Sequence, residues 1–298
     1  MNIEELEALR KTARNRILFG MLASVVAGVV LLAVTKMIPL AAIVLFGGGV
    51  VSALIGNKAS AAFKKAFKDT FVLRSLQKTF DNLVYEPERG LAESVIASTN
   101  MMRMGDRYSS NDLISGSYKG VNFVQADVHI EEEHQSTDSD GHTTTTWVTL
   151  FLGRWMVFDF NKSFKANVQV SQKGFGNSKI SNWGAKTKFK RVKMEDELFN
   201  KSFRIFAQEE HDAFYILTPS LMERIKRLAD GVSGKLLLCF IDDKLHVAVH
   251  NNKDSFEHSI FRKIDEEKVL DSISQDIKLI TGFIEELNLD NDLFKKEM

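Results

Sequence analysis

Cysteine, proline and, over one long stretch, charge are all scarce in this chain of 298 residues. The one cysteine, Cys239, excludes a disulfide within the chain and fits a reducing compartment. It lies in the apolar run Leu236 to Ile241, a position that favours a small core residue over a catalytic nucleophile. With three prolines and no low-complexity run, nothing marks a linker in residues 57–298, which we expect to form one domain.

Charge is almost absent between Ile17 and Gly56, where Lys36 is the one charged residue. About twenty apolar residues cross the core of a bilayer, so this stretch predicts two transmembrane helices, Ile17 to Thr35 and Met37 to Gly56. Because so few residues join them, we expect a tight helical hairpin. A buried hairpin of a soluble protein is disfavoured by two runs of full spanning length, and a cleaved signal peptide by the acidic residues before Ile17.

Basic residues flank the apolar stretch on both sides. They are Arg10, Lys11, Arg14 and Arg16 before it, and Lys58, Lys64, Lys65 and Lys68 after it. Positive charge on short flanks stays on the cytoplasmic side, so we expect a multi-pass protein of the inner (plasma) membrane with both termini in the cytoplasm. The predicted organisation is a cytoplasmic N-terminal helix in residues 1–16, a transmembrane hairpin in 17–56 and a cytoplasmic α+β domain in 57–298.

Small residues recur at every fourth position on both predicted spans. They are Gly20, Ser24 and Gly28 on the first span, and Gly48, Ser52 and Gly56 on the second. Small residues at this spacing let helix backbones approach closely in lipid. Packing of the two helices within one chain is the simpler interpretation, and packing between chains in a homo-oligomer stays open.

The hydrophobic pattern beyond the hairpin predicts an α+β fold, with a mainly antiparallel sheet and flanking helices. Predicted helices cover residues 59–83 and 91–98 and begin again at Pro219 and Glu266. Predicted strands cover residues 121–130, 143–160, 168–170, 203–207, 236–241 and 245–249. Residues 134–142 form the tip of one predicted hairpin, Asp242 to Lys244 the turn of another, and residues 109–120 are rich in turn formers.

No residue set has the spacing of a known catalytic or metal motif. Polar residues of the first predicted hairpin share one strand face or lie near it, and they are His129, Glu131, Glu133, His134 and His142. Imidazole and carboxylate groups can bind a metal, but a solvated face explains this set better. Asp138 to Gly141 resembles the start of a calcium loop without its closing glutamate. His246 and His250 share one strand face, which predicts a polar outer surface. We therefore assign no catalytic residue, no metal ligand and no cofactor.

A basic segment from Lys173 to Lys193 carries seven basic residues and no acidic one, interleaved with aromatic residues. Such a segment can bind phosphate groups, and for a membrane-tethered domain the nearest polyanion is the anionic lipid surface rather than nucleic acid. The predicted lipid-binding residues are Lys64, Lys65, Lys68, Lys186, Lys188, Lys190, Arg191 and Lys193. A solvated loop with an exposed strand is the plain alternative.

Four segments carry a resemblance to a known family. They are residues 111–123 (NDLISGSYKGVNF), 153–164 (GRWMVFDFNKSF), 216–224 (ILTPSLMER) and the pair Phe256 and Glu257. The chain resembles the bacterial membrane-protein family known as domain of unknown function 3137, whose members often carry a similar two-span hairpin. The resemblance implies a bacterial envelope setting. It implies no activity, and no functional residue is carried over.

The sequence favours a membrane-anchored cytoplasmic binding or scaffold domain that recognises a protein partner or the anionic lipid surface. The firm anchor and the lack of catalytic motifs lead to this hypothesis. The alternative is a membrane-tethered hydrolase-like enzyme that uses the histidines and acids of the Asp127 to His142 hairpin, with or without a metal.

Overall fold

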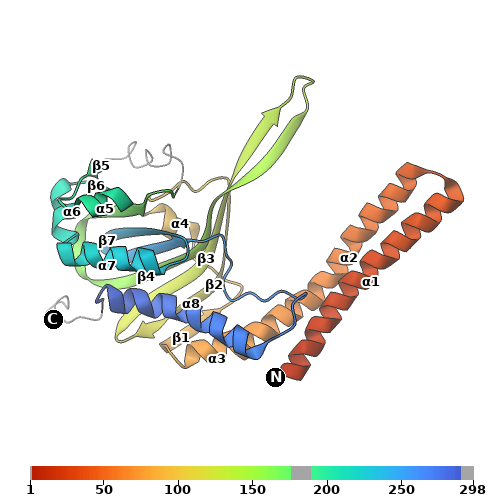
Figure 1. Ribbon diagram of the computed structural model, residues 1–298, viewed down its shortest axis with the longest axis horizontal. Coiled ribbons are helices and arrows are strands. Elements are labelled where there is room, and N and C mark those ends of the chain that lie inside the picture. The colour runs from red at the N-terminus through yellow and green to blue at the C-terminus, as the bar shows by residue number, and fades with distance from the viewer. Residues whose placement is uncertain (1, 176–188, 290–298) are drawn as a thin grey trace. The chain divides into compact units, whose positions relative to one another are not determined.

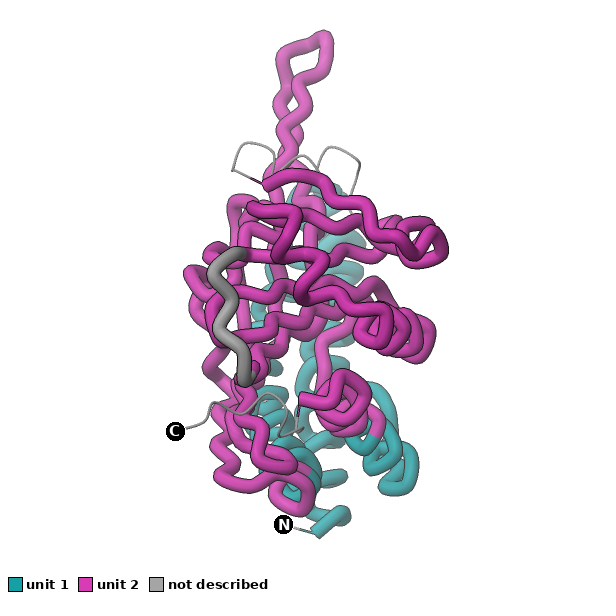
Figure 2. Tube along the Cα trace, turned by 90° about the vertical axis from the view of Figure 1, so that its left-hand side faces the viewer, with its two compact units in different colours: residues 1–75, 256–274 teal, residues 76–255, 275–298 magenta. Residues whose placement is uncertain are grey.

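The computed structural model describes residues 2–175 and 189–289, and it divides into two compact units. The first unit contains residues 1–75 and 256–274, and the second contains residues 76–255 and 275–298 (Figure 2). The helix α8, Glu266–Glu286, begins in the first unit and ends in the second.

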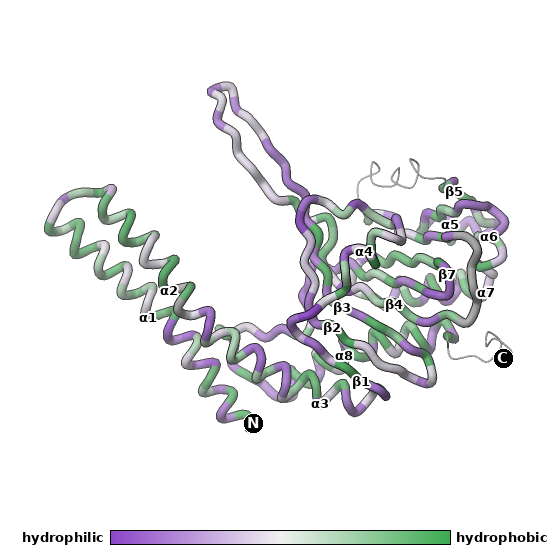
Figure 3. The backbone as a smooth tube through the Cα atoms, turned by 180° about the vertical axis from the view of Figure 1, so that it is seen from behind, coloured by the Kyte–Doolittle hydropathy of each residue, from purple (hydrophilic) through white to green (hydrophobic). Residues whose placement is uncertain are grey.

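The first unit is built on two long antiparallel helices, α1 (Ile3–Thr35) and α2 (Ile38–Phe67). A capping box starts α1: the Asn2 side chain accepts from the Glu5 amide at 2.8 Å, and the Glu5 carboxylate accepts from the Asn2 amide at 3.1 Å. Lys36 ends α1 in the left-handed conformation, with φ 55°. Proline in the first turn of α2 then costs no backbone hydrogen bond. Figure 3 shows the apolar stretch along both helices.

After Phe67 the chain does not continue as one regular helix. A π-helical turn, η1 (Lys68–Val72), precedes the short α3 (Leu73–Gln77). The sequence predicted helix as far as Leu83, but Leu83 lies in β1 (Asp81–Glu86). The helix ends earlier than predicted because Phe80 packs against Phe123 of the sheet, with ring centroids 4.7 Å apart.

Within residues 76–175, 189–255 and 275–289, the second unit is organised by a seven-stranded sheet in which every strand pair is antiparallel. Its strands are β1, β2 (Arg107–Tyr118), β3 (Val121–Thr137), β4 (Thr143–Gln172), β5 (Lys190–Val192), β6 (Phe203–Ala207) and β7 (Lys235–His250). The order is β1-β2-β3-β4-β6-β5, and β7 pairs with β4. The 30-residue strand β4 is central, since it pairs with β3, β6 and β7 (Figure 1).

Both faces of the sheet are covered. On one face, Phe123 and Phe158 lie against each other, and Phe158 packs against Phe283 of α8. On the opposite face, Val128 and Trp155 join a buried cluster with residues of the segment that contains α4 (Glu93–Ala97). The remaining helices are α5 (Glu197–Ser202), α6 (Glu210–Ile216) and α7 (Pro219–Gly231). The predicted fold class, a two-helix N-terminal hairpin followed by an antiparallel sheet with flanking helices, is confirmed.

Two predictions about strands are wrong. Residues 236–249 do not form a hairpin, because both halves belong to β7 and pair with β4 in one direction. Asp242 has φ 52° and marks an irregularity in this ladder rather than a chain reversal. Residues 109–120, read as rich in turn formers, lie mostly in β2, in which Asp112 has φ 55°. In both places, polar residues at a strand irregularity have the composition of a turn.

Candidate functional site

The apolar stretch of the first unit exposes the side chains that a soluble protein would bury. Phe19 is 69% exposed and Phe46 is 79% exposed, and most large apolar residues from Leu18 to Leu54 are also exposed. Both long helices are long and apolar enough to cross a membrane. A core helix of a soluble protein would be mostly buried, whereas only a small share of these helices is buried. These two candidate spans suggest association with a membrane.

The predicted small residues lie where α1 and α2 meet. A Cβ atom added to Gly20 would overlap the Ser52 side chain, and one added to Gly48 would overlap Ser24. The same addition at Gly28 would meet Leu45, and at Gly56 it would meet Ile17. The serine hydroxyls stay on their own helices, since Ser24 Oγ donates to Gly20 O at 2.8 Å and Ser52 Oγ donates to Gly48 O at 2.6 Å. Association between chains through these residues stays a prediction.

The basic residues after the second span divide into two groups. Lys64 Nζ and Lys68 Nζ both contact the Glu257 carboxylate, at 2.8 and 2.9 Å. Burial opposes ionisation of Glu257, but hydrogen bonds from the two lysines outweigh it and lower the pKa of this carboxyl. Lys68 is buried, whereas Lys65 is exposed. Lipid binding at this flank, which stays a prediction, is therefore easiest for Lys65.

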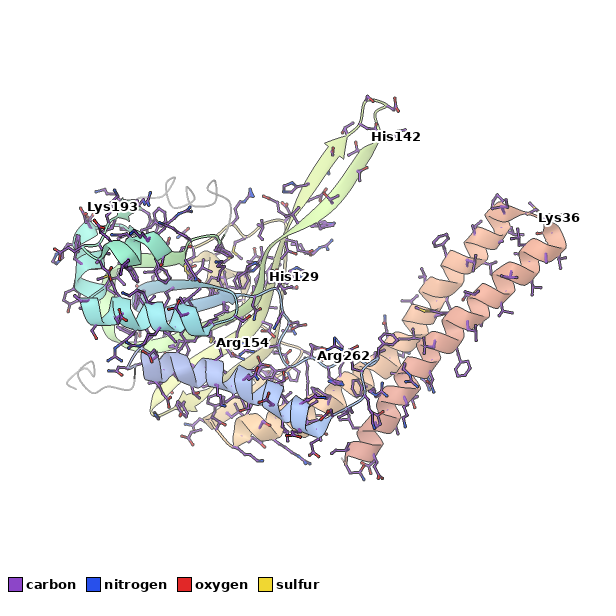
Figure 4. The ribbon with its side chains drawn as sticks, in the orientation of Figure 1. Lys36, His129, His142, Arg154, Lys193 and Arg262 are labelled. Carbon is purple, nitrogen blue, oxygen red and sulfur yellow. The ribbon has the colours of Figure 1, made fainter. Side chains whose placement is uncertain are left out.

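The segment after β7 is held against the helices of the first unit. The buried Arg10 donates from Nη1 to Ile260 O at 2.6 Å and pairs with Glu7. His258 stacks on Phe67 with ring centroids 5.3 Å apart. Figure 4 labels Arg262, the residue whose carbonyl lies 3.2 Å from His258 Nε2. These contacts make residues 256–264 part of the first unit.

The basic segment of the second unit is described only at its ends. Lys186 and Lys188 lie outside the described residues. Lys190 and Arg191 are exposed on β5 and Lys193 follows it, also exposed (Figure 4), while the intervening Val192 is buried. Arg191 and Lys193, on either side of the buried Val192, place positive charge on the outer face here. Binding of lipid headgroups there stays a prediction.

The histidines and acids of the β3–β4 hairpin do not gather into one site. His129 lies near the sheet and His142 near the tip of the projecting hairpin (Figure 4). His129 and His134 contact neighbouring glutamates on their own strand, Glu131 at 3.7 Å and Glu132 at 3.1 Å. Gln135 donates to Glu133 at 2.5 Å, and His142 contacts Asp138 at the tip. These groups form a ribbon of surface pairs rather than a convergent ligand set.

A different set of acids converges, from three parts of the second unit. Asp127 lies on β3, Asp112 lies at the irregularity of β2, and Asp254 lies in the loop after β7. One carboxylate oxygen from each lies within 4.8 Å of the others. Asp112 and Asp127 are buried and Asp254 is exposed. Sequence reasoning missed this set because long stretches of chain separate its members, and the one local signal was a carboxylate, Asp127, inside an apolar strand.

The surroundings of Asp127 explain its electrostatics. Its side chain is 1% exposed, and its Oδ2 accepts from the Ser255 amide at 2.6 Å. Arg154, opposite it on β4, places Nε 3.9 Å from Asp127 Oδ1 and donates from Nη1 and Nη2 to Asp276 O and Oδ1, at 2.7 and 2.9 Å. Burial raises the pKa of Asp127; the Arg154 guanidinium opposes this rise, and the Asp254 carboxylate adds to it.

The predicted polar face of β7 is wrong. His246 and His250 do share one side of the strand, but His246 is buried and its Nδ1 lies 3.2 Å from Trp155 Nε1. Burial, with a smaller contribution from Lys244, lowers the pKa of His246 to about 4. His250 Nδ1 accepts from the Leu152 amide at 3.1 Å. The alternation was read correctly, but this sheet is covered on both faces, so the histidine side faces the core.

The comparisons with known proteins concern the C-terminal half of the chain and the fold. Residues 149–289 match the model of a family described as "Protein of unknown function (DUF3137)". No curated protein matches the chain. The crystal structure of the mycobacterial trehalose monomycolate transport factor A, TtfA, is similar at 8% identity, covering 74% of this chain and 93% of that chain, with a TM-score of 0.37. At this similarity nothing about function transfers. The resemblance to this family predicted from the sequence is confirmed over the matched part, residues 149–289.

Proposed function

We propose that the chain is an integral membrane protein whose helices α1 and α2 anchor a binding or scaffold domain at the cytoplasmic surface. The observation that carries the proposal is the exposed apolar surface between Leu18 and Leu54. Exposed apolar surface of this extent is stable in lipid and not in water. The basic flanks around residues 10–16 and 58–68 support an orientation with both ends of the hairpin in the cytoplasm.

The β3–β4 hairpin supports a binding role for the domain. β2 pairs with β3 only as far as Glu131, and β7 pairs with β4 only from Gly153 onward. Within the described residues, the outer part of the hairpin therefore pairs only with itself and extends beyond the sheet as an arm (Figure 1). Arg107 lies over the Trp147 ring at 3.8 Å from its centroid, near the base of the arm. An arm with two open edges suits recognition of a protein partner by strand addition.

Anchoring is tested by deleting residues 17–56 and extracting membranes with alkaline carbonate. The intact chain should stay in the membrane pellet, because its apolar helices are held by the bilayer core. The deleted chain should appear in the supernatant as a folded protein. Deletion of residues 132–148, which removes the arm, is the matched control and should leave the chain in the pellet. Release of the intact chain by carbonate would contradict the anchor.

Recognition is tested by cross-linking in membranes with the intact chain and with the arm deletion. Loss of a specific cross-linked partner on deletion of residues 132–148 would support partner binding by the arm. The anionic lipid surface is tested separately, with liposomes and a hairpin-deleted chain that carries Lys190→Glu, Arg191→Glu and Lys193→Glu. Unchanged liposome binding by this variant would contradict lipid recognition at β5. Turnover of a metabolite by the purified domain would contradict a scaffold role altogether.

A further inference from the structure

The acids on β2, β3 and the loop after β7 have the arrangement of a cation site. We infer that Asp112, Asp127 and Asp254 bind one hard divalent cation of the size of Ca²⁺. Three carboxylate oxygens within 4.8 Å of one another can reach one ion together. Asp254 is exposed, so an ion has access from solvent, while the other two carboxylates are buried. Nothing in the proposed scaffold role requires this site.

Two buried oxygen atoms with no hydrogen-bond partner point to a ligand. Asp127 Oδ1 has no hydrogen-bond donor among the described residues, although the side chain is 1% exposed. Gln125 Oε1, two residues earlier on the same face of β3, is likewise buried and unpartnered. Asn111 and Ile114 of β2 pair with Asp127 and Gln125, so Asp112 lies in the irregular stretch of β2 between these two pairs. Buried oxygens without donors are uncommon, and a bound cation satisfies several of them at once.

The charges around the cluster also favour a divalent cation. Arg154 is a buried cation beside the cluster, and its Nη1 and Nη2 donate to Asp276. Its Nε lies 3.9 Å from Asp127 Oδ1, next to three acidic residues that gather at one place. An excess of buried negative charge is costly unless it is neutralised. A divalent ion would neutralise this charge and share the carboxylates with their present donors, which are Ser255 for Asp127, Tyr85 and Asn111 for Asp112, and Asn111 for Asp254.

The spacing distinguishes between the common hard cations. Oxygens bind Ca²⁺ at about 2.3–2.6 Å, so two ligands on opposite sides of the ion lie up to about 5 Å apart. For Mg²⁺ at about 2.0–2.1 Å, the limit is about 4.2 Å, and the geometry must be close to octahedral. Oxygens that all lie within 4.8 Å of one another are within the span that Ca²⁺ can bridge, and Ca²⁺ accepts irregular geometry more readily than Mg²⁺. The all-oxygen donor set also excludes a preference for soft metals.

The experiment is calorimetric titration of the full chain in detergent with CaCl₂, after removal of metals with a chelator, and a parallel titration with MgCl₂. We expect one Ca²⁺ per chain and Mg²⁺ binding weaker by about tenfold or more, because Mg²⁺ tolerates this spacing less well. Asp127→Asn and Asp254→Asn should each weaken Ca²⁺ binding by about tenfold or more, since each removes a charged ligand. Asp138→Asn is the matched control and should change nothing, because Asp138 lies at the exposed tip of the arm.

Each contrary result overturns the inference. Lack of Ca²⁺ binding up to about 1 mM, the weak end of natural sites, would show that a shared proton rather than a metal satisfies these oxygens. Equal or tighter binding of Mg²⁺ would overturn the assignment of ion size. Loss of binding in Asp138→Asn would move the site to the arm. Because Asp254 is exposed, Asp254→Asn tests the site even where Asp127→Asn perturbs folding.

Discussion

The two units of this protein treat apolar side chains in opposite ways. In the first unit, large apolar residues such as Phe19 and Phe46 are exposed along two uncharged helices, whereas in the second Trp155 and Phe158 are fully buried between a sheet and its helices. In the second unit, apolar side chains pack against one another inside the fold, whereas in the first unit many of them stay exposed. The contrast supports association of the two long helices with a membrane, where exposed apolar side chains are stable.

Truncation in the core of the second unit should have the largest effect. Trp155→Ala removes a fully buried ring and its hydrogen bond to His246, and it should cost about 3–5 kcal/mol of the free energy of unfolding. Each kcal/mol lowers the melting temperature of a domain this size by about 2–4 °C, so thermal unfolding of the detergent-solubilised chain will report it. Trp147→Ala is the matched control, because Trp147 is 38% exposed on the arm. An equal loss in both variants would contradict the assigned core.

A charge introduced on the exposed face of the first unit should be nearly as costly, although water would tolerate it. Val26→Asp places a carboxylate on a side chain that is 54% exposed near the middle of the first span. In a membrane this costs about 2.5–3.5 kcal/mol of insertion free energy. Leu198→Asp, at a residue 63% exposed on α5, is the control and should have little effect. The fraction of each variant resistant to carbonate extraction measures the difference, and normal membrane retention of Val26→Asp would contradict a lipid-facing α1.

Bulk at the contact between α1 and α2 should separate them at a cost of about 1–3 kcal/mol, the usual cost of overpacking. Gly48→Leu would collide with Ser24, whereas Gly47→Leu has nothing within 4 Å of the added Cβ. Electron paramagnetic resonance distances between spin labels at Leu18 and Leu54, in a Cys239→Ser background, should lengthen only in Gly48→Leu. Similar distances in both variants would show that the small residues do not set the packing of these helices.

The smallest effect concerns the buried histidine of β7. Because the pKa of His246 falls from 6.5 to about 4 on folding, the unfolded chain binds its proton first as pH decreases. Above pH 6.5, His246 is neutral in both states and does not change the free energy of unfolding. At pH 5.5 the free energy of unfolding is lower by about 1 kcal/mol, and it decreases further until pH 4. His246→Gln keeps an acceptor near Trp155 without titrating. Its melting temperature should fall less between pH 7.5 and 5.5 than that of the unaltered chain, and an identical fall would refute the buried, neutral state.

The sequence predicted local features well and long-range ones poorly. The uncharged stretch, the tight turn between its two helices and the helix start at Pro219 depend on neighbouring residues, and all three are present in the structure. β2 was missed because its serine, asparagine and glycine residues have the composition of a turn, while pairing with β1 and β3 on both sides holds it extended. Strand pairing is a tertiary effect that overrides local propensity.

The candidate cation site was beyond sequence reasoning for the same physical reason. Asp112 joins Asp127 only through an irregularity in the β2–β3 ladder, and Asp254 reaches them only after β7 has paired with β4. The prediction that His246 lies on a polar outer face was wrong for a different reason. The alternation of side chains is visible in the sequence, but the sequence does not show that both faces of the sheet are covered. A strand pattern tells which side chains share a face, and only the tertiary fold tells whether that face meets water.

The orientation of the hairpin is the most direct test of the proposed membrane anchor. Single cysteines at Lys36 and at Ser139, on the arm of the second unit, can be labelled with a membrane-impermeant maleimide in intact bacterial cells. The native Cys239 is buried and burial raises the pKa of its thiol, so it should contribute little background. Labelling of Lys36→Cys in intact cells, with labelling of Ser139→Cys only after lysis, is the result predicted here. Labelling of Ser139→Cys in intact cells would contradict a cytoplasmic domain held by a two-span anchor.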